Sequence, residues 1–194
     1  MKKYFIVAGE PSGDLHGSKL IKAIKHLNPN SSFMGHGGDS MRNEGMHIIE
    51  HVDSLAIMGF AEVLRHLPRM NKIMRNTVGA IERSKPDRVI LIDYPGFNLR
   101  LAKRLSPLKI PITYFILPQA WAWKQRRVEV LKRFIDQSIS IFPFENDWYK
   151  KHGLRVDYFG HPFVDIEHFN ETTKSFYKRH SLNINNPILT LLPG

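Results

Sequence analysis

The sequence predicts an α/β fold, a Rossmann-like, doubly wound and mostly parallel sheet with helices on both faces. Along most of its 194 residues, short apolar runs alternate with segments of helical periodicity. Repeated β–α units with short loops build parallel sheets. The run 89–92 is continuous and mostly β-branched, as is typical of a strand buried on both faces. This run and residues 4–8 both end in loops with acidic residues and glycine, and open α/β sheets place ligand sites at such strand ends.

Each expected element follows from local periodicity and from the residues that bound it. Strands are expected over residues 4–8, 32–35, 47–52, 88–92, 112–117, 138–142 and 155–159. Helices are expected over residues 14–27, 39–43, 61–83, 99–105, 126–134, 145–152 and 172–180. Within the longest of these, Pro68 suits the first turn of a new helix.

The composition changes towards the carboxyl end of the chain. Residues 165–186 are polar, residues 183–187 have the character of a linker, and the apolar run 187–192 is expected to be one more strand. We therefore expect residues 1–182 to form an amino-terminal domain. Residues 183–194 would be a linker and the first strand of a second domain that is cut short.

Composition limits the classes of function. The hydrophobic fraction of 42% supports a packed core, and the absence of cysteine excludes disulfides and thiolate metal sites. No HExxH, GxSxG or GxxxxGK[ST] pattern occurs, so neither a metal site nor a cofactor is expected. No apolar run approaches the roughly 18 residues that span a bilayer. The net charge of +10 favours nucleic acid, acidic lipid headgroups or phosphorylated substrates, or is simply a basic surface without a single partner.

Asp93 is the strongest candidate for a catalytic residue, because it follows the buried run 89–92 directly. Its carboxylate, ionised at neutral pH, would orient or deprotonate an acceptor hydroxyl. The alternative is a structural cap of the loop at Pro95 and Gly96.

The first loop offers a second group of candidates. Glu10, Ser12 and Gly13 lie between a strand and a helix, where free backbone N–H groups can bind an anion. The alternative is an ordinary turn with Ser12 or Asp14 as the N-cap. The loop lacks the GxGxxG pattern, which disfavours a Rossmann dehydrogenase.

A third candidate loop, residues 118–127, is rich in aromatic and basic side chains. Trp121 and Trp123 offer flat apolar surface to a sugar or acyl chain, and the cations that follow can meet phosphate. These cations are Lys124, Arg126 and Arg127. The alternative is core packing beside a solvated basic helix.

Residues 55–74 combine an apolar stripe with basic flanks, a pattern that fits an amphipathic helix on an acidic membrane. Burial of the stripe in the core is the commoner explanation of such a pattern. The apolar candidates are Ile57, Met58, Phe60, Val63, Leu64, Leu67 and Met70.

Seven segments in this order together resemble the lipid-A-disaccharide synthase family. They are AGEPSGD (8–14), MGFAEVL (58–64), IDYPGFN (92–98), PQAWAWKQRR (118–127), PFE (143–145), GHP (160–162) and LLPG (191–194). The resemblance implies an inverting glycosyltransferase of the GT-B architecture. Such enzymes join UDP-2,3-diacylglucosamine to 2,3-diacylglucosamine 1-phosphate (lipid X), giving the β-1,6-linked lipid A disaccharide and UDP.

The resemblance also implies roles for individual residues. The family's essential aspartate falls on Asp93, as general base towards the acceptor 6-hydroxyl or as a group that orients it. Glu10 matches an acidic residue of the first loop, while Asn98, Gln119 and Trp121 match motif positions without defined roles. The family works without a catalytic metal, and the stripe 55–74 corresponds to its membrane-facing patch. The implied location is peripheral, on the cytoplasmic face of the inner membrane of Gram-negative bacteria.

Family chains are nearly twice as long, so this chain is expected to be inactive in transfer by itself. Two other functions stay open, a non-catalytic membrane- or lipid-binding module and a different GT-B enzyme acting on a UDP-sugar. A nucleic-acid partner is not expected, because no helix-turn-helix or RNP-like motif occurs. The sequence does not indicate an oligomeric state.

Overall fold

The computed structural model describes residues 1–56, 67–164 and 171–191. Contacts divide the chain into two compact units, Met1–Pro162 and Phe163–Gly194. Within the second unit, helix α8 (Thr173–Arg179) is capped by the Thr172 hydroxyl, which accepts a hydrogen bond from the Ser175 backbone N–H. No helix in the described ranges is both long and apolar enough to cross a membrane.

The first unit is built on one parallel sheet, as the sequence predicts. Its strands are β1 (Lys3–Ala8), β2 (Ser32–Gly37), β3 (His47–His51), β4 (Arg88–Ile92), β5 (Ile112–Phe115), β6 (Gln137–Ser140) and β7 (Asp157–Tyr158). Their order in the sheet is β3-β2-β1-β4-β5-β6-β7, and every neighbouring pair is parallel. This order is that of a doubly wound Rossmann-like sheet.

Helices alternate with these strands. They are α1 (Pro11–Leu27), α2 (Asp39–Asn43), α3 (Val52–Ala56), α4 (described from Leu67 to Ser84), α5 (Pro95–Leu105), α6 (Arg127–Phe134) and α7 (Pro143–Lys151), with a 3₁₀ turn at Ser106–Leu108. Helices α1, α5 and α7 begin two to four residues earlier than expected, each with a proline in its first turn. Val52, the first residue of α3, was expected to end a strand. Residues 61–66 of the expected long helix lie outside the described residues.

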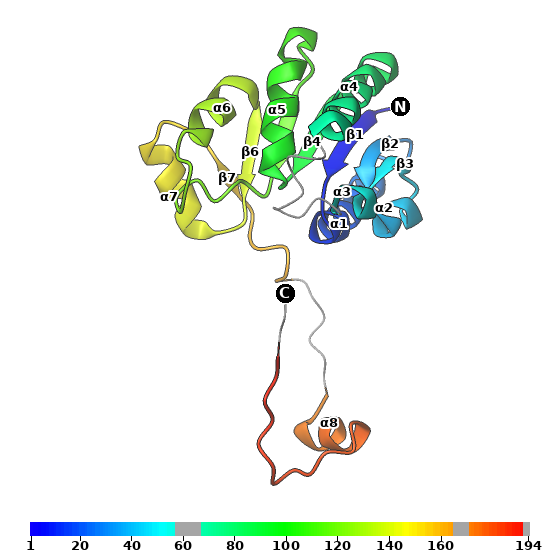
Figure 1. Ribbon diagram of the computed structural model, residues 1–194, viewed down its shortest axis with the longest axis vertical. Helices are drawn as coiled ribbons and strands as arrows, with labels where there is room; N and C mark the ends of the chain where they lie inside the picture. The colour runs from blue at the N-terminus through cyan, green and yellow to red at the C-terminus, as the bar shows by residue number, and fades with distance from the viewer. Residues whose placement is uncertain (57–66, 165–170, 192–194) are drawn as a thin grey trace. The chain divides into compact units, whose positions relative to one another are not determined.

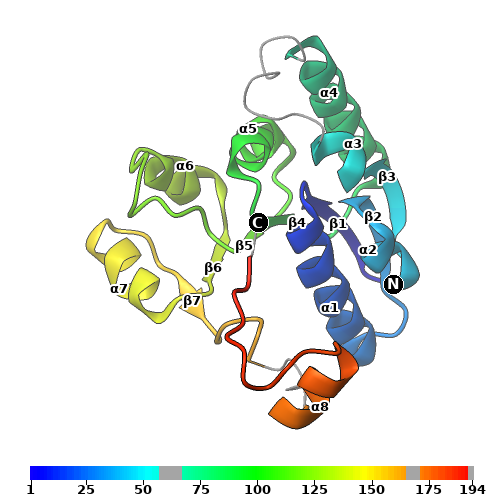
Figure 2. The same ribbon diagram turned by 60° about the horizontal axis from the view of Figure 1, so that its bottom comes forward.

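The sheet is covered on both faces because its strands are apolar on both faces. Phe5 and Val7 belong to one core cluster, together with residues of α4, α5 and α6. Ile6 and Ala8 belong to the other cluster, with Ile21 of α1 and Met41 of α2. Figures 1 and 2 show α4 and α5 together on one side of the sheet and α1 on the other. The continuous apolar runs therefore correctly predicted strands that are buried on both faces of the sheet.

The strand expected over 187–192 is not formed in its described part. Residues 187–191 have no regular secondary structure, and none of the strand pairs of the sheet includes them. A strand needs a neighbour to take up its backbone N–H and C=O groups, so an apolar run alone does not produce one.

The strand order changes direction between β1 and β4, and this point positions the candidate site. Ala8 and Ile92, the last residues of these strands, are directly paired. The loops that begin at Gly9 and Asp93 are therefore neighbours, although 84 positions separate them in the chain. Ligands of open α/β sheets bind outside the strand ends at such a switch point.

Candidate active site

The turn after β4 has an unusual backbone. Asp93 and Tyr94 both adopt left-handed conformations, with φ values of 43° and 49°. Non-glycine residues in this region cost on the order of 1–3 kcal/mol each, and they persist only where the surrounding structure holds them. The first turn of α5 then begins at Pro95.

Two side chains hold this turn by hydrogen bonds to its backbone. The Asn98 side-chain amide and the Tyr114 hydroxyl each donate a hydrogen bond of 2.7 Å to the Asp93 backbone carbonyl. The same amide also donates to the Ile92 carbonyl at 3.2 Å. Asn98 is fully buried, and the hydrogen bonds of its amide position the Asp93 turn. Its binding of substrate stays a prediction.

The loop after β1 packs directly against the same turn. A Cβ placed on Gly9 would lie 2.2 Å from the Tyr94 ring, closer than any side chain tolerates. The glycine therefore lets the ring cover the backbone at the end of β1. Tyr94 in turn stacks on Phe97 of α5, with ring centroids 5.7 Å apart. The two loops that the sequence singled out thus meet in one place.

The Asp93 carboxyl group is half-buried and strongly influenced by its neighbours. Burial, followed by the nearby Glu10 carboxylate, raises the pKa of Asp93 to about 6. A hydrogen bond from the Tyr94 backbone N–H and the Arg127 charge oppose this rise. A carboxylate with a raised pKa is a better proton acceptor than an ordinary aspartate and is still ionised at neutral pH. Asp93 and Glu10 therefore share one electrostatic environment at the end of the sheet.

The first loop differs from its expected capping. Helix α1 starts at Pro11, so Glu10 occupies the N-cap position and its side chain makes no cap hydrogen bond. The alternative in which Ser12 or Asp14 caps this helix was therefore wrong. Ser12 is exposed, whereas Gly13 is buried, where an added Cβ would lie 3.1 Å from the Ala8 Cβ. Anion binding by this loop stays a prediction.

The buried Asp14 carboxylate has a structural role in the neighbouring helix α2. It accepts hydrogen bonds from the backbone N–H groups of Gly38, Ser40 and Met41 at 2.7–3.0 Å. These are N–H groups at the start of α2, which have no acceptor within the helix. The α1 carboxylate therefore caps α2, a contact that the sequence did not reveal.

The aromatic and basic loop lies after β5, next to β4 in the sheet. Gln119 is exposed, while Trp121 is half-buried and donates its indole N–H to Glu145 at 3.1 Å. Trp123, by contrast, is 49% exposed. The two tryptophans therefore differ in role, since one anchors the loop and the other faces solvent. Substrate binding by Gln119 and Trp121 stays a prediction.

The predicted membrane stripe is mostly outside the described residues. This applies to Ile57, Met58, Phe60, Val63 and Leu64, and to the side chain of Leu67. Met70, on α4, is partly buried against the core cluster. A role of this stripe in membrane binding stays a prediction. Among the described residues, no group of three or more His, Asp or Glu side chains could hold a metal ion.

With this geometry in view, comparison with known proteins identifies the family. The family model described as Lipid-A-disaccharide synthetase matches residues 4–194. The chain belongs to this family.

Individual relatives agree with this assignment. The lipid-A-disaccharide synthase of Myxococcus xanthus (strain DK1622) is 38% identical over 192 residues, which cover 99% of this chain and 50% of the relative. That of Acidobacterium capsulatum is 40% identical over 191 residues, 98% of this chain and 48% of the relative. The chain spans about half the length of the curated relatives it matches.

A solved structure supports the fold alone. The UDP-GlcNAc 2-epimerase from Neisseria meningitidis bound to UDP-GlcNAc has a TM-score of 0.56 at 12% identity, over 80% of this chain and 45% of that chain. The Rossmann-like α/β class predicted from the sequence is confirmed.

Proposed function

We propose that this chain forms the acceptor-binding half of a glycosyltransferase of lipid A biosynthesis. The reaction joins UDP-2,3-diacylglucosamine to lipid X and releases UDP. The observation that carries the proposal is Asp93, a half-buried carboxyl group with a pKa raised to about 6, at the switch point of the sheet. Membership of the Lipid-A-disaccharide synthetase family supplies the reaction class.

In the proposed mechanism, Asp93 acts as the general base. Its carboxylate takes the proton of the acceptor 6-hydroxyl as that oxygen attacks the anomeric carbon of the donor sugar. The bond from this carbon to the UDP oxygen breaks, and UDP leaves with the electron pair. Because the attack comes from the side opposite UDP, the new linkage has inverted configuration. Burial, and after it the Glu10 carboxylate, keeps the pKa of Asp93 high, which strengthens the base.

The wider organisation of the protein is part of the same proposal. Residues 1–182 form the acceptor domain, and residues 183–194 lead into a second domain that binds the nucleotide sugar. The support is that the relatives are about twice as long as this chain. Transfer is therefore expected only when the second half is also present. The candidates Ile57, Met58, Phe60, Val63 and Leu64 of the stripe bind the anionic cytoplasmic surface of the inner membrane, where both lipid substrates reside. The stripe residues Leu55, Ile73 and Met74 belong to the core cluster instead.

The test is transfer by a protein in which this chain is joined to the second half that its relatives carry. Asp93→Asn keeps the size of the side chain but removes the base. We expect kcat to fall by about 10²–10⁴-fold, with the affinity for lipid X retained. Full transfer by this variant would contradict the mechanism.

Asp87→Asn is the matched control, because Asp87 is exposed and precedes β4 while Asp93 follows it. Its transfer rate should equal that of the wild type. If the chain is a non-catalytic lipid-binding module, a different result is expected. Lipid X then binds, but neither the wild type nor the variants transfer sugar. Circular dichroism of both variants separates a chemical effect from unfolding.

A further inference from the structure

The loop after β5 presents one exposed aromatic ring with two cations beside it. The Trp123 ring is 49% exposed, and Lys124 and Arg127 both lie against it. We infer that Trp123, Lys124 and Arg127 bind the phosphate-bearing end of the sugar acceptor, with the phosphate held as a monoester dianion. This inference rests on the proposed function, because it takes the acceptor hydroxyl to lie at Asp93.

The cluster lies on a loop that is anchored by buried residues of α7. The Trp121 indole N–H donates to Glu145, which is 1% exposed, at 3.1 Å. The Tyr149 hydroxyl donates to the Pro118 carbonyl, and Ala120, between Pro118 and Trp121 in the chain, is fully buried. Glu145 and Tyr149 both lie on α7, and they hold the start of the loop. The residues that follow are thereby presented to solvent in a defined position.

The cations are already arranged around the ring. The Lys124 ammonium lies 4.4 Å and the Arg127 guanidinium carbon 4.6 Å from the Trp123 ring centroid. Lys124 adopts a left-handed conformation with φ 56°, which turns the chain at this point. Contacts of this kind hold flexible basic side chains in place. A ligand that needs both cations therefore meets a partly organised site.

In the part of the chain that the structure describes, the charges of this cluster have no carboxylate partner at contact distance. Within the described ranges, no Asp or Glu forms an ion pair with Lys124 or Arg127. The Arg127 charge nevertheless reaches the Asp93 carboxyl group, whose pKa it lowers. Arg127 of the cluster is thus within electrostatic range of the proposed catalytic base, although no ion pair between them is formed at contact distance. An anionic group of the substrate would supply the missing partner.

The residue types fit a phosphorylated sugar. An indole face packs against the apolar C–H face of a pyranose ring. Arginine offers a planar fork of donors to phosphate oxygens, while lysine contributes a compact charge. The diphosphate of a nucleotide has the same chemistry, but the acceptor is the substrate whose hydroxyl must reach Asp93. We therefore assign the cluster to the acceptor phosphate.

The experiment is a fluorescence titration of the chain with three ligands, following tryptophan emission. The ligands are 2,3-diacylglucosamine 1-phosphate in detergent micelles, the same lipid without its phosphate, and UDP. Lys124→Ala and Arg127→Ala should each weaken binding of the phosphorylated lipid about ten-fold or more. Binding of the phosphate-free lipid should stay unchanged.

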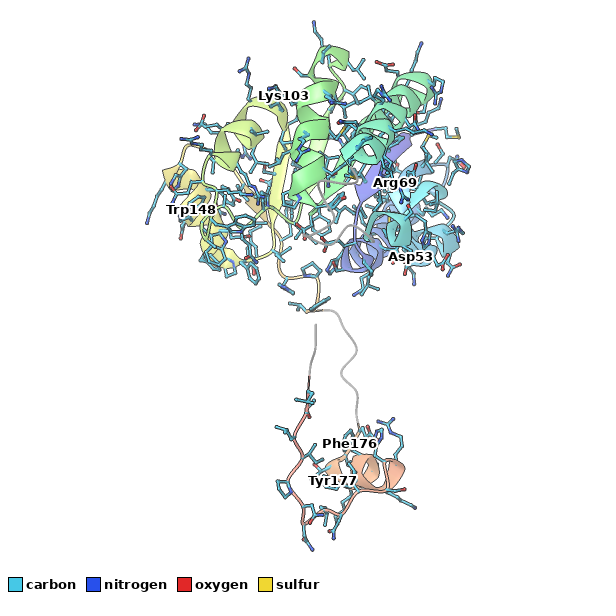
Figure 3. The ribbon with its side chains drawn as sticks, in the orientation of Figure 1. Asp53, Arg69, Lys103, Trp148, Phe176 and Tyr177 are labelled. Atoms are coloured by element: carbon cyan, nitrogen blue, oxygen red, sulfur yellow. The ribbon has the colours of Figure 1, made fainter. Side chains whose placement is uncertain are left out.

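Two controls test whether position or mere charge matters. Arg133→Ala removes an exposed cation of α6 that lies over the Phe134 ring, not over the Trp123 ring. Lys103→Ala removes an exposed cation near the carboxyl end of α5 (Figure 3). The Asp93 turn lies at the other end of the same helix, before its first residue. Neither should alter the affinity for the phosphorylated lipid. Thermal melting checks the fold, and Lys124→Met replaces Lys124→Ala if the latter is unfolded.

The outcomes separate this inference from the proposed function. Equal weakening of both lipids, or unchanged binding of both, would overturn the assignment, as would a loss confined to UDP. If binding depends on the phosphate and on Lys124 but Asp93→Asn transfers normally, the mechanism fails and the phosphate site stands. If Asp93 is required for transfer but the phosphate has no effect on binding, the phosphate site fails and the mechanism stands.

Discussion

The side-chain amide of Asn98 lies 2.7 Å from the backbone carbonyl of Asp93, inside the first turn of the helix that follows it. The contact is completely buried on the Asn98 side. A second donor, the Tyr114 hydroxyl of β5, reaches the same carbonyl. The backbone carbonyl of the proposed catalytic aspartate is thus held by one helix, α5, and one strand, β5.

Removing either donor should loosen the turn. Tyr114→Phe deletes one hydrogen bond, and we expect a loss of about 1–2 kcal/mol in the free energy of unfolding. Asn98→Ala removes a buried amide that donates to both the Ile92 and the Asp93 carbonyl. It should cost more, roughly 2–4 kcal/mol. Both variants should lower kcat more than they raise KM, because the Asp93 carboxylate is less well placed. Urea denaturation and transfer kinetics measure the two effects.

Tyr158→Phe is the control for this pair, since Tyr158 is 38% exposed on β7. It should match the wild type in both measurements. A Tyr114→Phe protein with reduced stability but unchanged kcat would mean that the hydrogen bond supports the fold and not the position of Asp93.

Gly9→Ala should disturb the same turn from the other side. The new methyl group would lie 2.2 Å from the Tyr94 ring, so the ring must move. We expect a loss of about 1–3 kcal/mol in stability, as for other overpacked sites. Chemical denaturation measures the loss, and near-ultraviolet circular dichroism reports displacement of the aromatic ring.

The matched control is Gly96→Ala, because an added Cβ at Gly96 meets nothing within 4 Å. In the first turn of α5 this change should be neutral or slightly stabilising. Tyr94→Gly should suppress the effect of Gly9→Ala, since it removes the ring and suits the positive φ. Additive losses in the double variant would show that the Tyr94 ring is not the cause.

Asp14→Ala should destabilise α2 specifically. The change removes three hydrogen bonds to backbone N–H groups, from a carboxylate that is only 6% exposed. We expect a loss of roughly 2–4 kcal/mol, with Asp14→Asn intermediate because its amide keeps one acceptor oxygen. Amide hydrogen exchange over 38–43 should accelerate before the rest of the sheet does.

Asp39→Ala gives the comparison within the same helix. Its carboxylate pairs with Arg42 on the surface and is 72% exposed. Exposed pairs contribute only about 0–1 kcal/mol, so the loss should be small. Equal losses for the two aspartates would contradict the capping role of Asp14.

The sequence predicted the sheet well because each strand is an apolar run with turn residues at its ends. The helix starts were less accurate. At Pro11, Pro95 and Pro143 the first helical turn precedes the apolar residues that reveal helical spacing. Helix α3 is a single short turn, too brief for periodicity to distinguish it from the end of a strand.

The candidate site was predicted in outline only. Asp93 and Glu10 could be identified because strand ends carry function in this fold class. The Tyr114 and Gly9 contacts could not, since they depend on which strands are neighbours and on two consecutive left-handed residues. Asn98 resembled a binding residue, although its amide is directed into the fold. Sequence position shows which residues lie at the strand ends but not which way their side chains point.

Asp93→Asn should make the protein more stable at neutral pH while it lowers activity. Burial raises the pKa of Asp93 from 3.8 to about 6. Between these pH values the folded protein binds more protons than the unfolded chain, so the contribution of Asp93 to stability falls as pH rises through about 6. The shift corresponds to roughly 3 kcal/mol. Asparagine avoids this cost and also tolerates the left-handed conformation.

The measurement is the difference in unfolding free energy between variant and wild type from pH 4 to pH 8. A difference is needed because His36 acts in the opposite direction. Burial lowers the pKa of His36 to about 4, so its contribution to stability is lost as pH falls from about 6.5 through 4. Both proteins contain His36, and its effect cancels. The difference should grow with pH and level off above about pH 7, and a constant difference would mean that the carboxyl group of Asp93 is not perturbed by burial.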